Sequence, residues 1–331
     1  QGLANNTDLQ TAILKVKEAQ AALMTSRLAY APMLALSPQG TISSFDKSAA
    51  TKTYSLPVTA SWELDLFGNL LNAKRGSQVA LLQTKAYRQA VQTQIISGIA
   101  NTYYTLLMLD KQLEISEQTA DVMKRNVETM RAMKDAGMTN AAAVAQSEAA
   151  YAQVIASLPA IRQSIREAEN ALCMLLRQAP QAIKRSTLEE QQLPTQFSVG
   201  VPLQLLSNRP DVKAAEMNLA STYYNTNAAR AAFYPQITIS GSAGWTNSAG
   251  SVIVNPGKLL ASVVGSLTQP LFYRGQNIAR LKAAKAQEEQ AKLSFQQALL
   301  NAGSEVSNAL SLYQKTSEKV ESRQMQVESA K

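Results

Sequence analysis

The chain of 331 residues holds few side chains of the kinds that carry out chemistry. It has no histidine, which removes the commonest general base and the commonest metal ligand. Its one cysteine, Cys173, excludes an intrachain disulfide and a metal site built from several cysteines. The acidic residues are scattered, and the sequence shows neither a phosphate-binding loop nor a nucleophile motif. We therefore predict no catalytic site, no cofactor and no bound metal.

The charge of the chain does not point to a nucleic-acid partner. The formal net charge is +8, from 32 basic and 24 acidic residues. The basic residues occur as separated pairs, such as Lys74-Arg75 and Lys124-Arg125, without aromatic residues between them. A nucleic-acid-binding surface gathers them on one face. We read these pairs as the solvated surfaces of long helices and predict no nucleic-acid partner.

The residues whose spacing is informative alternate between apolar and polar types. Apolar residues alternate with Thr, Ser and Glu from 53 to 64, and the same period of two returns after Pro235. We expect two β-hairpins, at about 34–64 and 236–272, with the second strand of the second hairpin at about 261–272. Strands of roughly ten residues can cross a membrane when tilted. The apolar positions that would then face lipid are Leu56, Val58, Ala60, Ile237, Ile239 and Trp245.

Long helices must hold these hairpins in place. Between Gly68 and Gly137 there is no proline, and a helix over about 69–136 would be about 100 Å long. Its apolar residues come in doublets on more than one face, which indicates neighbours on both sides. Gly137 can end this helix, Thr139 or Asn140 can cap a return helix at about 141–177, and Pro159 is expected to kink it.

The chain reads as a duplication. The pairs Pro32 and Pro235, Phe67 and Phe272, and Arg75 and Arg280 are each 203 to 205 residues apart. We predict a first repeat over 1–177, a connecting segment over 178–206 and a second repeat over 207–331, each repeat with the order helix, hairpin, long helix, return helix. The long helix of the second repeat starts at about 275, so its tip and return helix are expected outside this chain.

Several motifs resemble those of the outer-membrane efflux proteins, the TolC/OprM family, and its NodT-type lipoprotein branch in particular. They are Trp62-Glu63-Leu64-Asp65-Leu66-Phe67-Gly68, Asn208-Arg209-Pro210-Asp211, Ala229-Arg230-Ala231-Ala232-Phe233-Tyr234-Pro235, and Gln269-Pro270-Leu271-Phe272 with Gly275. The junction positions between strands and helices are Trp62, Phe67, Gly68, Pro235, Phe272 and Gly275. The resemblance covers nearly the whole chain in the right order.

The resemblance implies a fold that is mainly α with β, assembled as a homotrimer. Three chains would form a 12-stranded barrel in the outer-membrane lipid, continued by an α-helical barrel in the periplasm. The segment 178–206 would belong to the equatorial region of that tunnel. Such a duct receives small molecules from an inner-membrane efflux transporter through a periplasmic adaptor protein.

The resemblance also places the periplasmic tip, where the adaptor docks and the tunnel closes. The matching residues here are Asp135, Gly137, Met138, Thr139 and Asn140. Family members often carry an acidic residue just after this turn. This chain has alanines over 141–143 and Glu148 further on, so the resemblance does not carry over an acidic cation-binding gate.

Another class of protein fits the same helices. A soluble periplasmic scaffold or adaptor with a long helical hairpin would also show these periods. The two readings differ at the hairpins, because a scaffold would tolerate lysine at Val58 or Ile239 and a lipid-facing strand would not.

Overall fold

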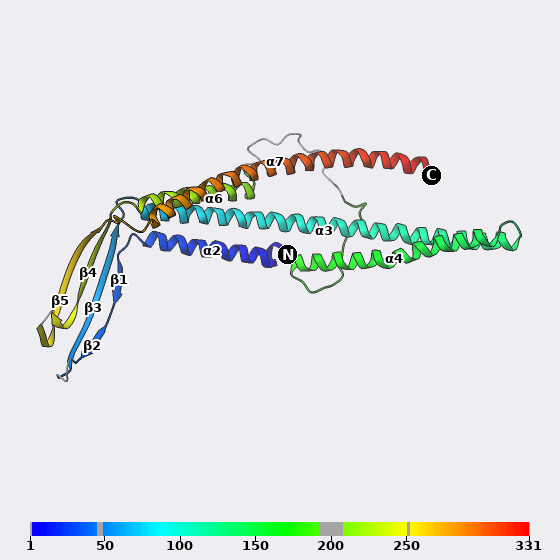
Figure 1. The fold of residues 1–331 in the computed structure, drawn as a ribbon. Helices are drawn as coiled ribbons and strands as arrows, with labels where there is room; N and C mark the ends of the chain where they lie inside the picture. Colours follow the sequence, from blue (N-terminus) through cyan, green and yellow to red (C-terminus); the bar gives the residue numbers. More distant parts are fainter. Residues whose placement is uncertain (1, 45–48, 192–207, 250–251, 331) are drawn as a thin grey trace. The chain divides into compact units, whose positions relative to one another are not determined.

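The computed structural model of the chain describes residues 2–44, 49–191, 208–249 and 252–330 (Figure 1). The helices are α1 (Gly2–Asn5), α2 (Thr7–Leu28), α3 (Asn69–Asp135), α4 (Ala141–Leu176), α6 (Pro210–Ala231) and α7 (Gln276–Ala330). The strands are β1 (Met33–Leu36), β2 (Gln39–Ser43), β3 (Thr51–Leu64), β4 (Gln236–Ala249) and β5 (Val252–Thr268). The predicted fold class, mainly α with β, is confirmed.

The chain folds into two compact units. One contains Gln1–Ile13 and Arg88–Gly200, and the other contains Leu14–Tyr87 and Val201–Lys331. Each unit is built from two separate segments of the chain. The division into compact units therefore differs from the predicted division into two successive repeats. The two sequence repeats remain a prediction.

The helices follow the pattern of helix-breaking residues. α3 runs for 67 residues, over a stretch without proline in which the glycines are Gly76 and Gly98. α4 is assigned as one helix through Pro159, which removes one backbone donor but does not divide the helix. Within the described ranges, none of the helices has both the length and the apolar character needed to cross a membrane.

All five strands form one antiparallel sheet. β3 pairs with β4 and β4 with β5, while β1 and β2 both pair with the other side of β3 (Figure 1). The first strand of the sequence-predicted hairpin is thus divided in two at Ser37 and Pro38. Pro38 has no N–H to give to the ladder, and the neighbouring Ser37 N–H donates to the carbonyl of Pro57 at 3.1 Å.

The predicted start of the last strand is wrong. β5 begins at Val252 instead of about 261, and it ends at Thr268 instead of about 272. The first half of β5 contains Pro256, and the sequence pattern predicts a loop there. In the described sheet β5 pairs only with β4, and an edge strand tolerates the missing N–H of a proline on its unpaired side. Pro270 follows its other end.

The side chain of Asn247 extends the pairing of β3 with β4 beyond the regular ladder. That ladder ends at the pair Ser55 and Thr246, and the register of β4 with β5 shifts at the same place. The Asn247 amide nitrogen donates to the carbonyl of Lys52 at 3.0 Å, and its amide oxygen accepts from the N–H of Tyr54 at 2.7 Å. Asn247 is only 6% exposed, so these two bonds satisfy a buried amide.

We predict that Asn247→Ala loosens this end of the sheet. The change removes the partners of one backbone donor and one acceptor, at a cost of about 1–3 kcal/mol for each group left buried and unpaired. The measurement is hydrogen–deuterium exchange at the Tyr54 amide in the folded protein, which should become faster. Ser262→Ala is the control, since it removes only an exposed hydroxyl contact with Ser242 of 2.8 Å. Equal exchange in Asn247→Ala and the unchanged protein would contradict the assignment.

Candidate functional site

The register of the sheet places most of its large apolar side chains on one face. Residues directly opposite in an antiparallel pair share a face, and successive residues alternate between faces. Leu56 pairs with Trp245, and Trp62 pairs with Ile239. Trp245 and Ile239 pair in turn with Leu259 and Gly265 of β5. The large side chains and alanines on this apolar face are Leu34, Leu36, Ile42, Leu56, Val58, Ala60, Trp62, Leu64, Ile237, Ile239, Ala243, Trp245, Leu259, Ala261, Val263 and Leu267, and the same register adds Tyr54 and Lys52 near the end of β3.

Many large side chains of the apolar face are exposed among the described residues. Trp245 is 59% exposed, Val263 is 80% exposed and Leu267 is 66% exposed. Large apolar side chains left open over a whole sheet face mark a surface that another apolar phase or partner covers. All six residues predicted to face lipid lie on this face: Leu56, Val58, Ala60, Ile237, Ile239 and Trp245.

The opposite face is lined mainly by hydroxyl groups. They belong to Ser43, Thr41, Thr51, Thr53, Ser55, Thr59, Ser61, Thr238, Ser240, Ser242, Thr246, Ser262, Ser266 and Thr268. Leu260 and Val264 interrupt the series on β5. Among the described strands, Glu63 and Lys258 are the charged residues that the register places there. The face is therefore polar but carries little formal charge.

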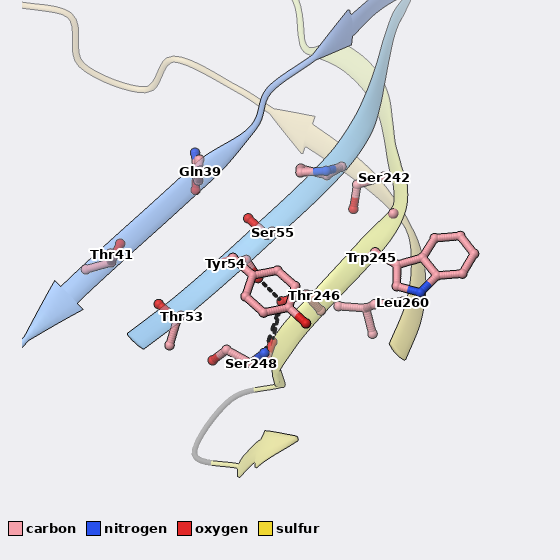
Figure 2. Close-up of a pocket in the computed structure, with 12 residues that line it drawn as sticks. Gln39, Thr41, Thr53, Tyr54, Ser55, Ser242, Trp245, Thr246, Ser248 and Leu260 are labelled. Atoms are coloured by element: carbon pink, nitrogen blue, oxygen red, sulfur yellow. Dashed lines mark hydrogen bonds between the residues drawn. The ribbon is translucent and has the colours of Figure 1, made fainter. Parts of the chain in front are cut away.

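A shallow pocket of about 310 Å³ lies on the hydroxyl-lined face, where β2, β3 and β4 meet (Figure 2). Figure 2 shows Thr41, Thr53 and Ser55 along β2 and β3, with Ser242 on β4. The Thr246 hydroxyl donates to the Tyr54 carbonyl at 3.2 Å. The pocket is lined by hydroxyl groups and the Gln39 amide on one hand and by Tyr54, Pro57, Trp245 and Leu260 on the other, so its lining is part polar and part apolar.

Glycine at each strand-to-helix junction has a left-handed backbone. Gly68 and Gly275 both have φ of +77°. The carbonyl of Gly68 accepts from the N–H of Asn72 at 3.0 Å, and that of Gly275 accepts from the N–H of Ala279 at 2.9 Å. A side chain at φ of this sign is strained, so glycine suits the turn in which the strand gives way to the helix.

Side chains fix the first junction by hydrogen bonds and by a pair of stacked rings. The Asp65 carboxylate accepts from the N–H of Leu71 at 2.7 Å and so caps the start of α3. The Trp62 indole N–H donates to the carbonyl of Tyr30 at 2.9 Å. Phe67 stacks on Tyr234, which stands beside Pro235, with ring centroids 5.0 Å apart. At the second junction Phe272 is 86% exposed.

The Arg-Pro-Asp motif starts α6 and links it to α7. Pro210 occupies the first turn, where its missing N–H has no intrahelical partner to lose. Two nitrogens of Arg209 donate to the two carboxylate oxygens of Asp211, at 3.1 and 2.7 Å. Arg209 also donates to Glu305 of α7 at 2.6 Å. The hydrogen bond from Arg209 holds the pKa of Asp211 below its ordinary value, so this start stays charged at neutral pH.

The turn between α3 and α4 contains the residues predicted as the tip. Asp135 is the last residue of α3, and Gly137 has φ of +75°. The N–H of Gly137 donates to the carbonyl of Lys134 at 2.9 Å, and that of Met138 donates to Met133 at 2.8 Å. These two bonds form a Schellman cap.

The other side of this turn is capped as well. The Asn140 side chain accepts from the N–H of Ala143 at 2.9 Å, which starts α4. Met138 projects outward and is 72% exposed, while Thr139 is half-buried. Asp135, Gly137 and Asn140 are exposed. The turn is therefore a fixed, capped loop that presents an apolar side chain to the outside.

We predict that Gly137→Ala destabilises this turn by about 1 kcal/mol, the usual cost of a left-handed alanine. No neighbouring atom lies within 4 Å of the position of an added Cβ, so the whole effect comes from the backbone. Hydrogen–deuterium exchange of the amides of residues 136–143 should rise. Gly137→Asn is the matched variant, because asparagine tolerates this conformation, and its exchange should stay closer to that of the unchanged protein. A larger effect of asparagine than of alanine would contradict the prediction.

Sequence reasoning missed several residues that position these features. The local pattern gives Asp65 no role beyond its motif and does not mark Asn247. The apolar residues of β5, such as Leu259 and Val263, fall outside the predicted lipid-facing set, because the predicted strand starts too late. Their alternation with Lys258 and Ser262 was a signal that could have found them.

A two-faced sheet continued by long helices defines a protein that forms part of a membrane channel. A family model for the outer membrane efflux protein matches residues 1–176 and 201–331. The chain belongs to the outer membrane efflux protein family.

Two individual relatives show how far the sequence similarity extends. The cation efflux system protein CusC of Escherichia coli O6:H1 is 29% identical over 331 residues, covering 98% of this chain and 71% of that protein. A probable outer membrane lipoprotein, SilC of Salmonella typhimurium, is 28% identical over 336 residues, covering 99% and 72%.

Solved structures of channels have the same fold. A crystal structure of CusC superposes with a TM-score of 0.88 at 28% identity, covering 98% of this chain and 76% of that one. The outer-membrane channel OprN gives a TM-score of 0.88 at 27% identity, covering 96% and 73%. The protein is an outer-membrane component of an efflux pump and reaches into the periplasm of a Gram-negative bacterium.

Proposed function

We propose that this chain is one subunit of a homotrimeric exit duct, through which small molecules leave the cell passively. An inner-membrane efflux transporter delivers them through a periplasmic adaptor protein. The duct catalyses no reaction and needs no cofactor. Membership of the efflux family supports this function over that of a soluble periplasmic scaffold.

The two-faced sheet is the observation that carries the proposal. Its apolar face would contact outer-membrane lipid, and its hydroxyl-lined face would line a water-filled passage. β1 and β2 lie along the same side of β3, so the chain supplies four strand positions. Open strand edges are not tolerated in lipid, and three chains would bring twelve positions together in a closed wall.

The capped turn between α3 and α4 is the part that we assign to contact with the adaptor. Asp135, Gly137, Met138, Thr139 and Asn140 form it, and its hydrogen bonds give it a defined shape without a partner. The exposed Met138 supplies a flexible apolar side chain of the kind that protein interfaces favour. The contact role of these residues, or a role as a gate, is part of the proposal.

The proposal predicts opposite results for two neighbouring substitutions. Ile239 lies on the apolar face and Ser240 on the hydroxyl-lined face. Lysine facing lipid costs about 2–4 kcal/mol near the middle of the membrane, and three copies would multiply that cost in a trimer. Ile239→Lys should therefore sharply reduce the amount of assembled trimer in outer-membrane fractions, whereas Ser240→Lys should leave it near the normal level.

Both variants are also measured for ion conductance after reconstitution in lipid bilayers. Ser240→Lys should assemble and conduct, with a changed preference between cations and anions because the new charge faces the passage. Normal assembly of Ile239→Lys, or a full-length protein that neither enters the outer membrane nor conducts, would overturn the proposed function.

A further inference from the structure

Residues 178–191 form an irregular segment that is nevertheless fixed to α3 and α4. We call this segment the strap. It has no helix and no strand, and it belongs to the same compact unit as Asp110 of α3 and Glu169 of α4. Side-chain contacts hold it at several points along its length. Such a segment is held by specific bonds and not by the regular hydrogen bonds of secondary structure.

Arg185 makes the central contact of the strap. Two of its guanidinium nitrogens, Nε and Nη2, donate to the two carboxylate oxygens of Asp110, the latter at 2.7 Å. The third nitrogen, Nη1, donates to Glu169 at 2.7 Å and to the carbonyl of Ile183 at 2.9 Å. One guanidinium therefore joins α3, α4 and the strap. The paired arrangement with Asp110 is the geometry in which arginine binds a carboxylate most specifically.

Two members of this cluster, Arg185 and Glu169, are largely removed from solvent, whereas the side chain of Asp110 is 36% exposed. The side chain of Glu169 is 8% exposed and that of Arg185 is 16% exposed. Burial alone would raise the pKa of Glu169, but the bonds from Arg185 and from the N–H of Ile183 bring that pKa below its ordinary value. Arg166 lies 3.5 Å from the other oxygen of Glu169. Without Arg185, Glu169 would keep only this longer contact to a positive charge.

Outer contacts hold both ends of the strap. Toward its start, the carbonyl of Gln181 accepts from the thiol of Cys173 at 3.5 Å, and Cys173 is 1% exposed. Toward its end, the hydroxyls of Tyr103 and Ser186 lie 3.1 Å apart, and Lys111 pairs with Glu189 at 2.8 Å. The one thiol of the chain is thus buried beside the strap.

We propose that Arg185 locks the strap onto α3 and α4, and that it holds these two helices in fixed register at this level. Any sliding or rotation of α3 against α4 here must first break the bonds of Arg185 to Asp110 and Glu169. Arg185 is a positioning residue in this account. The lock is a property of the chain's own helices and does not depend on the proposed function.

The buried thiol provides a direct measurement of the lock. The full chain, purified in detergent, is treated with a maleimide reagent, and the rate of modification of Cys173 is followed by mass spectrometry. Arg185→Met keeps an unbranched, flexible side chain but is shorter and removes the charge and the hydrogen-bond donors. We expect Cys173 to react at least tenfold faster in Arg185→Met, because the strap opens more often. Cys173→Ser measures the background.

Arg162→Met is the matched control. Arg162 of α4 pairs with Glu117 of α3 at 2.8 Å, but both side chains are about half exposed, and neither contacts the strap in the described contacts. Its loss should leave the reaction rate of Cys173 unchanged. Asp110→Asn with Arg185→Met should react no faster than Arg185→Met alone, since both changes break the same bond.

Two results would overturn the proposal. One is an unchanged reaction rate in folded Arg185→Met, and the other is an equal rise in Arg162→Met, which would show general loosening of the helices. Should Arg185→Met yield no folded protein, Arg185→Lys decides the question, because it keeps the charge and loses the paired geometry. An intermediate rate is expected for Arg185→Lys, and a rate equal to that of the unchanged protein would count against the lock.

Discussion

The backbone pairing of β3 with β4 is the constraint on which the rest of the structure depends. It joins residues 173 to 191 positions apart in sequence, and its register decides which side chains share a face. A shift of one strand by one residue would place Val58 and Ile239 on opposite faces of the sheet. The bonds of Asn247 to β3 continue this pairing just where the regular ladder stops.

The same constraint reaches the helices through the two junctions. Each strand that leaves the sheet turns at a glycine with a left-handed backbone, Gly68 or Gly275, and a long helix starts within two residues. Asp65 and the stacked rings of Phe67 and Tyr234 fix the first of these turns. Each of these long helices therefore begins directly where a strand of the sheet ends.

The elements that depend on the spacing of neighbouring residues could be predicted from the sequence. The contacts between residues far apart in the chain could not. Patterns among neighbouring residues predict the long helix, the turn at Gly137 and the strand around Val58. The fold class follows from these elements. The start of β5 was misjudged because a proline reads as a break unless one knows that the strand lies at an edge. The roles of Asn247 and Arg185 depend on partners 193 and 75 positions away, and no local pattern marks such a partner.

The scarcity of charge on the hydroxyl-lined face has a consequence for anything that travels along it. A hydroxyl both gives and takes a hydrogen bond and can rotate, so it can solvate an anion, a cation or an uncharged polar solute about equally well. None of these finds a strong fixed attraction there, and each can exchange one weak contact for the next. In the proposed duct, such a wall would favour transit over retention and would leave discrimination among cargoes to other components of the pump.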